Sequence, residues 1–252
     1  MSMIIYMKVA FVVFVIGEKY INDFNKYFKI PMQEYCKKYN YELIIQTSLL
    51  INETNVEKKK FYWQRIVIPY FFKDYDYVIS IDSDIYINKN SPPLPLNDIP
   101  EGKVAAVNER KYMGNYEWRE NIQQREGWEV TGKEWHAKSG ENRNYNDHIN
   151  GGFIIYQPKF HGDVMKKLYD ENINNYTKYH QDDQSILSLY FIDNDMIYWL
   201  DERYNKIWFF WKNIFYPGFD SYAENMKKAF VHNFLNLNYF THFTSGIDKQ
   251  YI

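Results

Sequence analysis

Two aspartates stand one residue apart in the segment VISIDSDIYIN, residues 78–88. In extended geometry the side chains of Asp82 and Asp84 point the same way. Two carboxylates placed together can bind a hard divalent cation, which prefers oxygen ligands, and such a cation can hold a diphosphate. The alternative is an Asp-Ser-Asp turn at a strand end, where Asp and Ser bond their own backbone. The apolar segment 85–87 favours the metal site, because a surface turn does not require it.

Apolar runs and helical spacing predict the elements that position these aspartates. Five short apolar runs are typical of buried strands: residues 9–16, 41–47, 77–81, 103–108 and 151–156. Apolar residues at helical spacing predict helices at residues 21–35 (with a kink at Pro31), 59–72, 160–168 and 182–191. The alternation of strand and helix predicts an α/β fold with a mostly parallel sheet covered by helices. Ligands bind such sheets at the carboxyl ends of the strands, where the two aspartates lie.

Two parts of the chain show no clear period. Residues 110–148 are polar and contain Trp118, Trp128 and Trp135, which predicts a loop-rich insert beside the site. These tryptophans could stack on a sugar or anchor the loop from within. From about residue 195 the sequence is aromatic and irregular. No repeat or linker divides the chain, so we expect one domain.

The composition excludes several classes of protein. With 46% apolar and 25% charged residues, the chain can bury a large core. Its net charge of −2 gives no support for a nucleic-acid partner, which usually requires a basic excess. The single cysteine, Cys36, cannot form an internal disulfide. The apolar run near the N-terminus is far shorter than the roughly 20 residues of a membrane span, and no cleavage site follows it. We therefore expect a cytoplasmic protein without a signal peptide or transmembrane segment.

An ordered series of motifs carries a resemblance to a known superfamily. The series runs FYWQRIVIPYFFKDYDYVISIDSDIYIN, VNER (107–110), INGGFIIYQP (149–158), DDQSILSLYF (182–191) and THFTSGIDK (241–249). In this order the motifs resemble those of the GT-A glycosyltransferases, whose Asp-X-Asp motif binds a metal and a nucleotide-sugar diphosphate. The chain is most similar to the plant xylosyltransferase and galactomannan galactosyltransferase group and to glycogenin-like transferases. The resemblance extends from Lys8 to Lys249.

The resemblance implies a fold and an activity. It implies a single GT-A domain over residues 1–252, with a mixed, mostly parallel central sheet flanked by helices. The nucleotide-binding part would span about 7–108, an acceptor-side insert about 110–148, and the remainder 149–252. The implied enzyme is a Mn²⁺-dependent (or Mg²⁺-dependent) glycosyltransferase. It would move a sugar from a nucleotide sugar, with UDP expected, to a hydroxyl of a glycan or glycoconjugate.

The resemblance also implies roles for individual residues. The metal ligands would be Asp82, Asp84 and His242, with His232 as the competing histidine. The residues implied to contact the donor are Arg65, Asp82, Ser83, Asn108, Asn150, Gly151, Gly152 and Lys249. The catalytic group would be Asp182, Asp183 and Gln184, facing the donor sugar. Asp183 would act either as the base that takes the acceptor proton or as a stabiliser of an oxocarbenium-like state. The alternative for this acidic group is capping of the helix that it opens.

Two other functions remain open at this point. A sugar-1-phosphate nucleotidyltransferase has a similar fold, but it requires a glycine-rich, basic loop after the first strand, and VIGEKYIND lacks one. A catalytically silent carbohydrate-binding relative would have no need of the Asp-X-Asp, histidine and acidic-helix set. Metal-dependent binding of UDP distinguishes these alternatives from the transferase.

Overall fold

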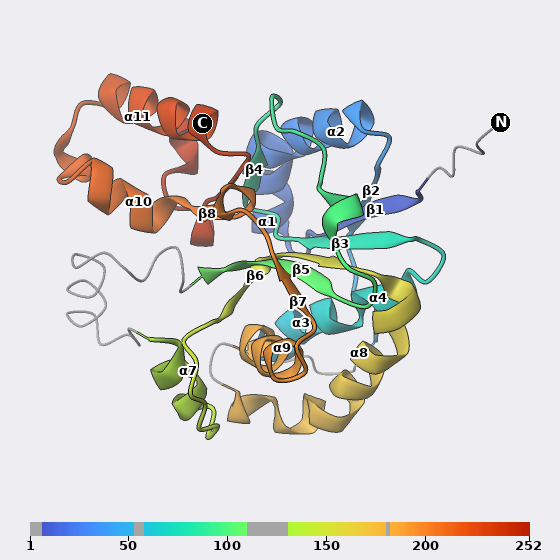
Figure 1. The fold of residues 1–252 in the computed structure, drawn as a ribbon. Helices are drawn as coiled ribbons and strands as arrows, with labels where there is room; N and C mark the ends of the chain where they lie inside the picture. The colour runs from blue at the N-terminus through green and yellow to red at the C-terminus, as the bar shows by residue number, and fades with distance from the viewer. Residues whose placement is uncertain (1–6, 53–57, 110–130, 180–181) are drawn as a thin grey trace.

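A six-stranded sheet forms the centre of the molecule in the computed structural model, which describes residues 7–52, 58–109, 131–179 and 182–252 (Figure 1). Its strands are β1 (Val9–Phe14), β2 (Glu42–Gln46), β3 (Tyr77–Ile81), β5 (Val104–Asn108), β6 (Ile149–Tyr156) and β7 (Ile197–Trp199). They lie in the order β2-β1-β3-β6-β5-β7. Strand β6 runs antiparallel to both of its neighbours, and the remaining pairs are parallel. The expectation of a mixed, mostly parallel sheet in a single α/β domain is therefore confirmed.

A second, smaller sheet joins the C-terminal part of the chain to the segment after Asp84. It consists of β4 (Ile85–Ile87), β8 (Lys206–Ile207) and β9 (Phe240–His242), in the order β4-β9-β8. The same part of the chain forms α10 (Trp208–Phe215) and α11 (Glu224–Leu237). The expectation of an irregular region after about residue 195 is wrong, because strands of two or three residues are too short to show an alternating pattern.

One face of the large sheet is covered by α1 (Glu18–Asp23), a π-helical turn (Phe24–Phe28) and α2 (Lys29–Lys38), together with the small sheet. Phe11 and Val13 of β1 belong to the core on this side, along with Phe24 of the π-helical turn. Pro31 has no N–H to donate to the carbonyl four residues earlier, and the π-helical turn lies directly before that position. The predicted distortion near Pro31 thus takes the form of a π-helical turn within a continuous helical segment.

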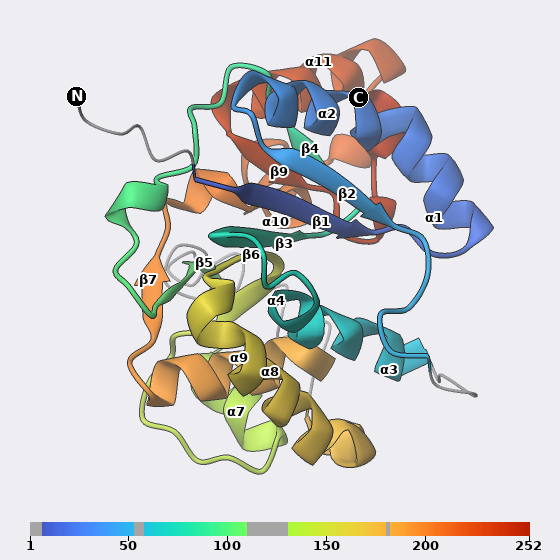
Figure 2. The same ribbon diagram turned by 90° about the vertical axis from the view of Figure 1, so that its right-hand side faces the viewer.

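The other face is covered by α3 (Lys58–Trp63), a 3₁₀ turn (Gln64–Val67), α4 (Ile68–Phe71), α8 (Pro158–Asn172) and α9 (Asp182–Asp193). Ala10 and Val12 of β1 pack here against Ile68, as the alternation of a strand requires. Figure 2 shows these helices on the opposite side of the sheet from α1, α2 and α11. Both faces of the sheet are thus largely apolar and covered, and Asp82 and Asp84 follow the carboxyl end of β3.

Part of the region expected to be loop-rich forms a helix, α7 (Gly132–Lys138). Thr131 caps its N-terminus, and the Thr131 and Glu134 side chains make a reciprocal capping box. The indole nitrogen of Trp135 donates to Ser185 of α9 at 2.9 Å, so this tryptophan anchors α7 from within. Trp118 and Trp128 lie outside the described residues.

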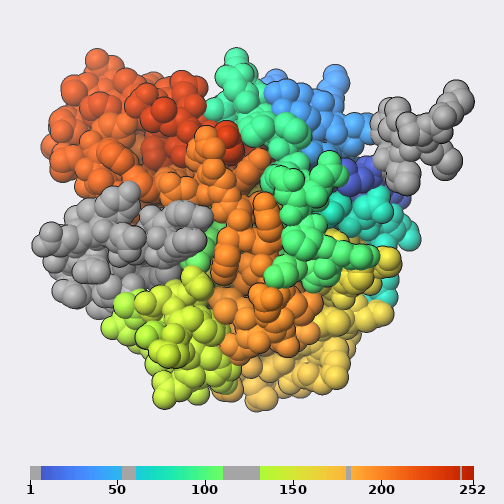
Figure 3. Space-filling view, in the orientation of Figure 1, coloured from blue at the N-terminus to red at the C-terminus, as the bar shows by residue number. Residues whose placement is uncertain are grey.

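The surface view in Figure 3 shows the orange segment that includes β7 crossing the molecule from α9 toward the C-terminal helices. This segment continues into β8 and so joins the large sheet to the small one. Among the helices that the structure describes, none has the length and apolar character needed to cross a membrane.

Candidate active site

Asp82, Asp84 and His242 meet at the carboxyl end of β3. The Nε2 atom of His242 lies 3.2 Å from Asp84 Oδ1 and 3.7 Å from Asp82 Oδ2. One ligand atom from each residue lies within 4.8 Å of the others. Carboxylate oxygens and an imidazole nitrogen together suit Mn²⁺, with Mg²⁺ as the harder alternative. The residues present therefore fit the divalent cation expected from the sequence.

The small sheet is what brings His242 to the aspartates. Strands β4 and β9 are antiparallel, and their register places Ile85 opposite His242. The backbone N–H of Phe243 then donates to the carbonyl of Asp84 at 2.9 Å. Asp82 is held from the other side, because its N–H donates to Gly152 O at 2.9 Å. Backbone hydrogen bonds alone therefore hold the two aspartates and His242 next to one another.

His232 lies elsewhere. It belongs to α11, so this competing histidine lies within a helix and not at a strand end, and its side chain is exposed. His242 is 5% exposed and faces two acids. Burial alone would lower the pKa of His242, but the carboxylates of Asp84 and Asp82 outweigh it and raise that pKa above its ordinary value. Its role as a metal ligand stays a prediction.

Arg65 joins the metal candidates to the start of α9. Its guanidinium is 14% exposed and forms ion pairs with Asp82 and with Asp183, the latter at 2.9 Å. Its Nη1 also donates to Gly151 O at 3.3 Å. Burial would lower the pKa of Arg65, but the two carboxylates raise it, so the side chain stays charged. The Arg65 guanidinium thus bridges Asp82, which follows β3, and Asp183 of α9.

Gln184 and Asn150 meet at a buried carboxylate. The N–H of Gly151 donates to Gln184 Oε1 at 2.9 Å, and Gln184 Nε2 donates to Glu109 Oε2 at 3.2 Å. Asn150 Nδ2 donates to the same oxygen of Glu109 at 3.4 Å. Glu109 belongs to the VNER motif, but the sequence predicts no role for it. The structure places it between the two predicted site residues.

Four predicted site residues remain: Ser83, Asn108, Lys249 and Asp182. Ser83 is half-buried in the turn between β3 and β4, whereas Asn108 is buried and donates to Asp147 at 2.5 Å. Lys249 forms an ion pair with Asp23 of α1. Asp182 begins α9, and its side chain lies outside the described residues.

Asn205 is a site residue that sequence reasoning missed. It is 2% exposed and lies directly before β8. Its Oδ1 is 3.1 Å from His242 Nδ1, and its Nδ2 donates to Asn150 Oδ1 at 2.7 Å. The segment RYNKI has no pattern that would have separated this asparagine from the many others in the chain.

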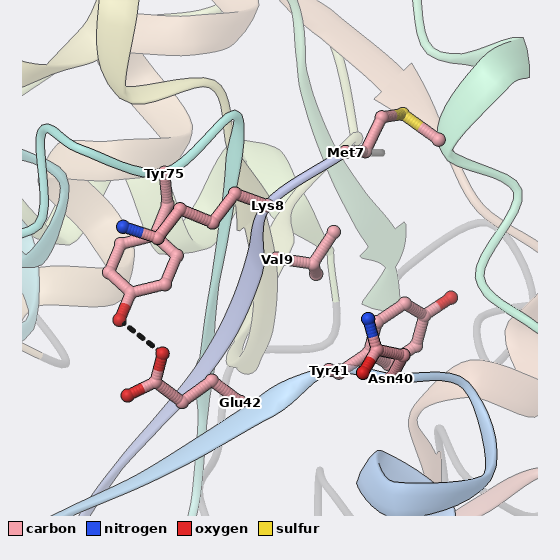
Figure 4. Close-up of a pocket in the computed structure, with 7 residues that line it drawn as sticks. All are labelled: Met7, Lys8, Val9, Asn40, Tyr41, Glu42 and Tyr75. Carbon is pink, nitrogen blue, oxygen red and sulfur yellow. Dashed lines mark hydrogen bonds between the residues drawn. The ribbon is translucent and has the colours of Figure 1, made fainter. Parts of the chain in front are cut away.

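A hollow of about 440 Å³ opens at the opposite end of the strands of the large sheet (Figure 4). Lys8 lies directly before β1, and Glu42 begins β2, so the hollow is at the amino ends of these parallel strands. Tyr75 donates to Glu42 there at 2.6 Å. This hollow is therefore separated from Asp82 and Asp84 by the length of the sheet.

No protein-family model matches the chain, and no curated protein matches it. Its fold is similar to several solved structures. One is a glycosyltransferase involved in the glycosylation of the major capsid of PBCV-1, with a TM-score of 0.59, 14% identity, and coverage of 97% of this chain and 98% of that chain. A second is the bifunctional glycosyltransferase WbbM, with a TM-score of 0.57, 15% identity and coverage of 96% and 47%. The present chain thus spans about half of WbbM.

A third is the galactosyltransferase LgtC in complex with donor and acceptor sugar analogs, with a TM-score of 0.52, 13% identity and coverage of 94% and 87%. At these identities the likeness concerns the fold. It shows that the six-stranded mixed sheet with its flanking helices is the GT-A fold.

Proposed function

We propose that this protein is a metal-dependent glycosyltransferase that moves a sugar from a nucleotide sugar, UDP-linked, to a hydroxyl of a glycan or glycoconjugate. The observation that carries the proposal is the convergence of Asp82, Asp84 and His242 at the carboxyl edge of a GT-A sheet. Ligands of open α/β sheets bind at this edge. The solved structures with this fold include a galactosyltransferase captured with donor and acceptor analogs, which supports the same class of reaction.

Asp82, Asp84 and His242 would hold Mn²⁺ or Mg²⁺. When bound, the ion would neutralise the negative charge that develops on the departing nucleoside diphosphate. Asp82 has a second duty, because one of its oxygens faces His242 while the other pairs with Arg65. Asp84 pairs with His242 and not with Arg65, and we propose it as the stronger metal ligand.

The donor-binding residues would surround this point. Gly151 carries no side chain and would allow a sugar to approach the backbone closely. At Gly152 the His242 ring fills the space of a side chain, so its proposed donor contact would be made by the backbone alone. Arg65 supplies fixed positive charge, and Ser83, Asn108 and Asn150 supply polar groups near the strand ends. Lys249 would offset diphosphate charge on leaving Asp23. The assignment of residues 7–108 to the nucleotide and 110–148 to the acceptor belongs to the same proposal, and the cytoplasmic location stays a prediction.

Asp183, with Asp182 and Gln184, would face the reacting carbon. The Asp183 side chain is almost fully buried and held by Arg65, so its position is set by the protein and not by solvent. A carboxylate here can take the proton of the acceptor hydroxyl or stabilise positive charge on the sugar. Gln184 is oriented by Gly151, which gives its amide one fixed direction.

Thermal unfolding with Mn²⁺ and a panel of nucleotides and nucleotide sugars tests the proposal. A donor that binds the folded state raises the melting temperature by mass action. We expect stabilisation by UDP or a UDP-sugar only when Mn²⁺ is present, together with slow Mn²⁺-dependent hydrolysis of the preferred donor. Absence of metal-dependent nucleotide binding would refute the proposal. Release of pyrophosphate from UTP and a sugar 1-phosphate would instead identify a nucleotidyltransferase.

A further inference from the structure

His242 is held from behind by one buried side chain. Its Nδ1 lies 3.1 Å from Asn205 Oδ1, while its Nε2 faces Asp84 and Asp82. A neutral imidazole carries its proton on only one nitrogen, and only the other can bind a metal. The nitrogen of His242 that is available to a metal therefore depends on whether Asn205 directs its oxygen or its NH₂ group at Nδ1.

The backbone of Gly152 fixes the direction of this contact. Gly152 N–H can only donate, and it lies 3.0 Å from the terminal amide of Asn150. The atom of Asn150 at that place must therefore be oxygen. The same oxygen lies 2.7 Å from the amide of Asn205, so the atom that Asn205 presents there must be the NH₂ group. Asn205 consequently has its oxygen toward His242, and Nδ1 of the ring must carry the proton.

The opposite end of Asn150 agrees with this assignment. With its oxygen on Gly152 and Asn205, its NH₂ group faces the Glu109 carboxylate at 3.4 Å. Turning Asn150 over would place two donors together at Gly152 and two acceptors together at Glu109. Turning Asn205 over would place two oxygens 2.7 Å apart. Only one arrangement satisfies all four contacts.

The ring is also confined by space. A side chain at position 152 would place its Cβ 2.5 Å from Cε1 and 2.8 Å from Nδ1 of His242. Glycine at this position therefore allows the ring to lie against β6. On the other side, β8 and β9 pair in parallel with Ile207 opposite His242, which places the segment carrying Asn205 beside the ring.

We infer that Asn205 is a positioning residue: through the chain Gly152–Asn150–Asn205 it fixes His242 with its proton on Nδ1 and the lone pair of Nε2 toward Asp82 and Asp84. The inference rests on the proposed function, because it concerns the same metal site. Groups that orient a metal-binding histidine in this way typically change metal affinity by about 10- to 100-fold when removed.

The test measures Mn²⁺ affinity alone, by electron paramagnetic resonance, in wild type, Asn205→Leu and Asn205→Ala. Asn205→Leu removes the acceptor for Nδ1–H, and we expect Mn²⁺ to bind roughly 10- to 100-fold more weakly. Asn205→Ala removes the same acceptor with a smaller side chain, and its affinity should fall by a similar factor. The matched control is Asn238→Leu, because Asn238 is also buried and hydrogen-bonded but lies outside the site. Its affinity should not change.

A second readout observes the ring itself. Long-range ¹H–¹⁵N correlations of the protein loaded with Zn²⁺, a diamagnetic probe, should show the proton of His242 on Nδ1 and the metal on Nε2. Metal on Nδ1, or equal Mn²⁺ affinity in wild type and Asn205→Leu, would overturn the inference while leaving the proposed function in place. If Asn205→Leu does not fold, equal affinity in wild type and Asn205→Ala would overturn it. Absence of Mn²⁺ binding by wild type would overturn both.

Discussion

His161 and His242 are both buried, yet their surroundings differ in one decisive respect. Both ring nitrogens of His161 are used by the backbone: Nδ1 accepts from Gln157 N–H, and Nε2 faces Gly102 O, each at 3.0 Å. In His242 only Nδ1 has a neutral partner, the side-chain oxygen of Asn205, and Nε2 is directed at two carboxylates. Burial lowers the pKa of His161 to about 4, whereas the pKa of His242 is raised. Burial therefore does not separate a structural histidine from the proposed metal ligand, whereas the partner of the second ring nitrogen does.

The largest expected effect tests the functional side of this comparison. In Asp84→Ala, the site loses one oxygen ligand and the nearest charge to His242. Because charge stabilisation by a bound metal contributes several kcal/mol, we expect transfer to fall roughly 1,000-fold and stabilisation by Mn²⁺ to disappear. The fold should persist, since the side chain is 26% exposed. Transfer assays and circular dichroism measure the two effects.

The control for Asp84→Ala is Asp163→Ala, which removes an exposed carboxylate of α8 that pairs with Lys73. It should change neither activity nor Mn²⁺ binding. Full activity in Asp84→Ala would contradict the metal role and reduce His242 to a second structural histidine.

Next in size is the pH dependence of stability from His161. Its folded pKa of about 4 lies below the ordinary value of 6.5, so the unfolded chain binds the proton more readily. The contribution of His161 is therefore fully present above pH 6.5 and is lost as the pH falls toward 4. A shift of this size corresponds to about 3 kcal/mol. Urea unfolding between pH 4 and 7 measures it.

His161→Gln isolates that contribution, because glutamine can offer one acceptor to Gln157 N–H and one donor to Gly102 O but does not titrate. Wild type should lose more stability on acidification than this variant, and Mn²⁺ affinity should be the same in both. If stability fell equally with pH in wild type and His161→Gln, or if His161→Gln bound Mn²⁺ more weakly, the assignment of His161 as structural and not metal-binding would be wrong.

The two aspartates and His242 differ in how well the sequence predicts their positions. The strand at 77–81 and the aspartates after it follow from local hydrophobic pattern, and the structure has that strand at Tyr77–Ile81. The position of His242 depends on β9, three residues long, pairing with β4 across most of the chain. Such pairing leaves no local periodicity. The motif THF predicts His242 as a metal ligand only through resemblance to a family.

The least predictable part of the site is its amide network. Asn205 acquires its role from the register of β8 with β9 and from the side chain of Asn150, neither of which is visible in a single sequence. The insert shows the same limitation: Thr131 and Glu134 form a capping box that the polar composition concealed. The local hydrophobic pattern therefore predicts the half of the candidate site that follows β3, whereas long-range strand pairing determines the remainder.

A smaller effect is expected from Arg65→Lys. Lysine keeps the charge but cannot bond Asp82 and Asp183 together, because it lacks the planar fork of the guanidinium. We expect transfer efficiency to fall about 10-fold, corresponding to one charge-assisted hydrogen bond. The matched variant is Arg203→Lys, which alters an arginine–aspartate pair that is 45% exposed and should be neutral. Equal effects in the two variants would show that Arg65 acts only through general charge.

The smallest effect concerns Lys249, whose partner in the structure is Asp23 of α1. If Lys249 serves the donor diphosphate, Lys249→Met should raise the KM for the donor about 3- to 10-fold, as expected for one solvent-screened charge. Asp23→Asn breaks the same ion pair but leaves the lysine cation in place, so it should leave that KM unchanged or lower it. If the pair only anchors the C-terminal segment, both variants should lower the melting temperature equally and share one KM. Steady-state kinetics with thermal unfolding of the two variants therefore separates a binding lysine from a structural one, as the second ring nitrogen separates His242 from His161.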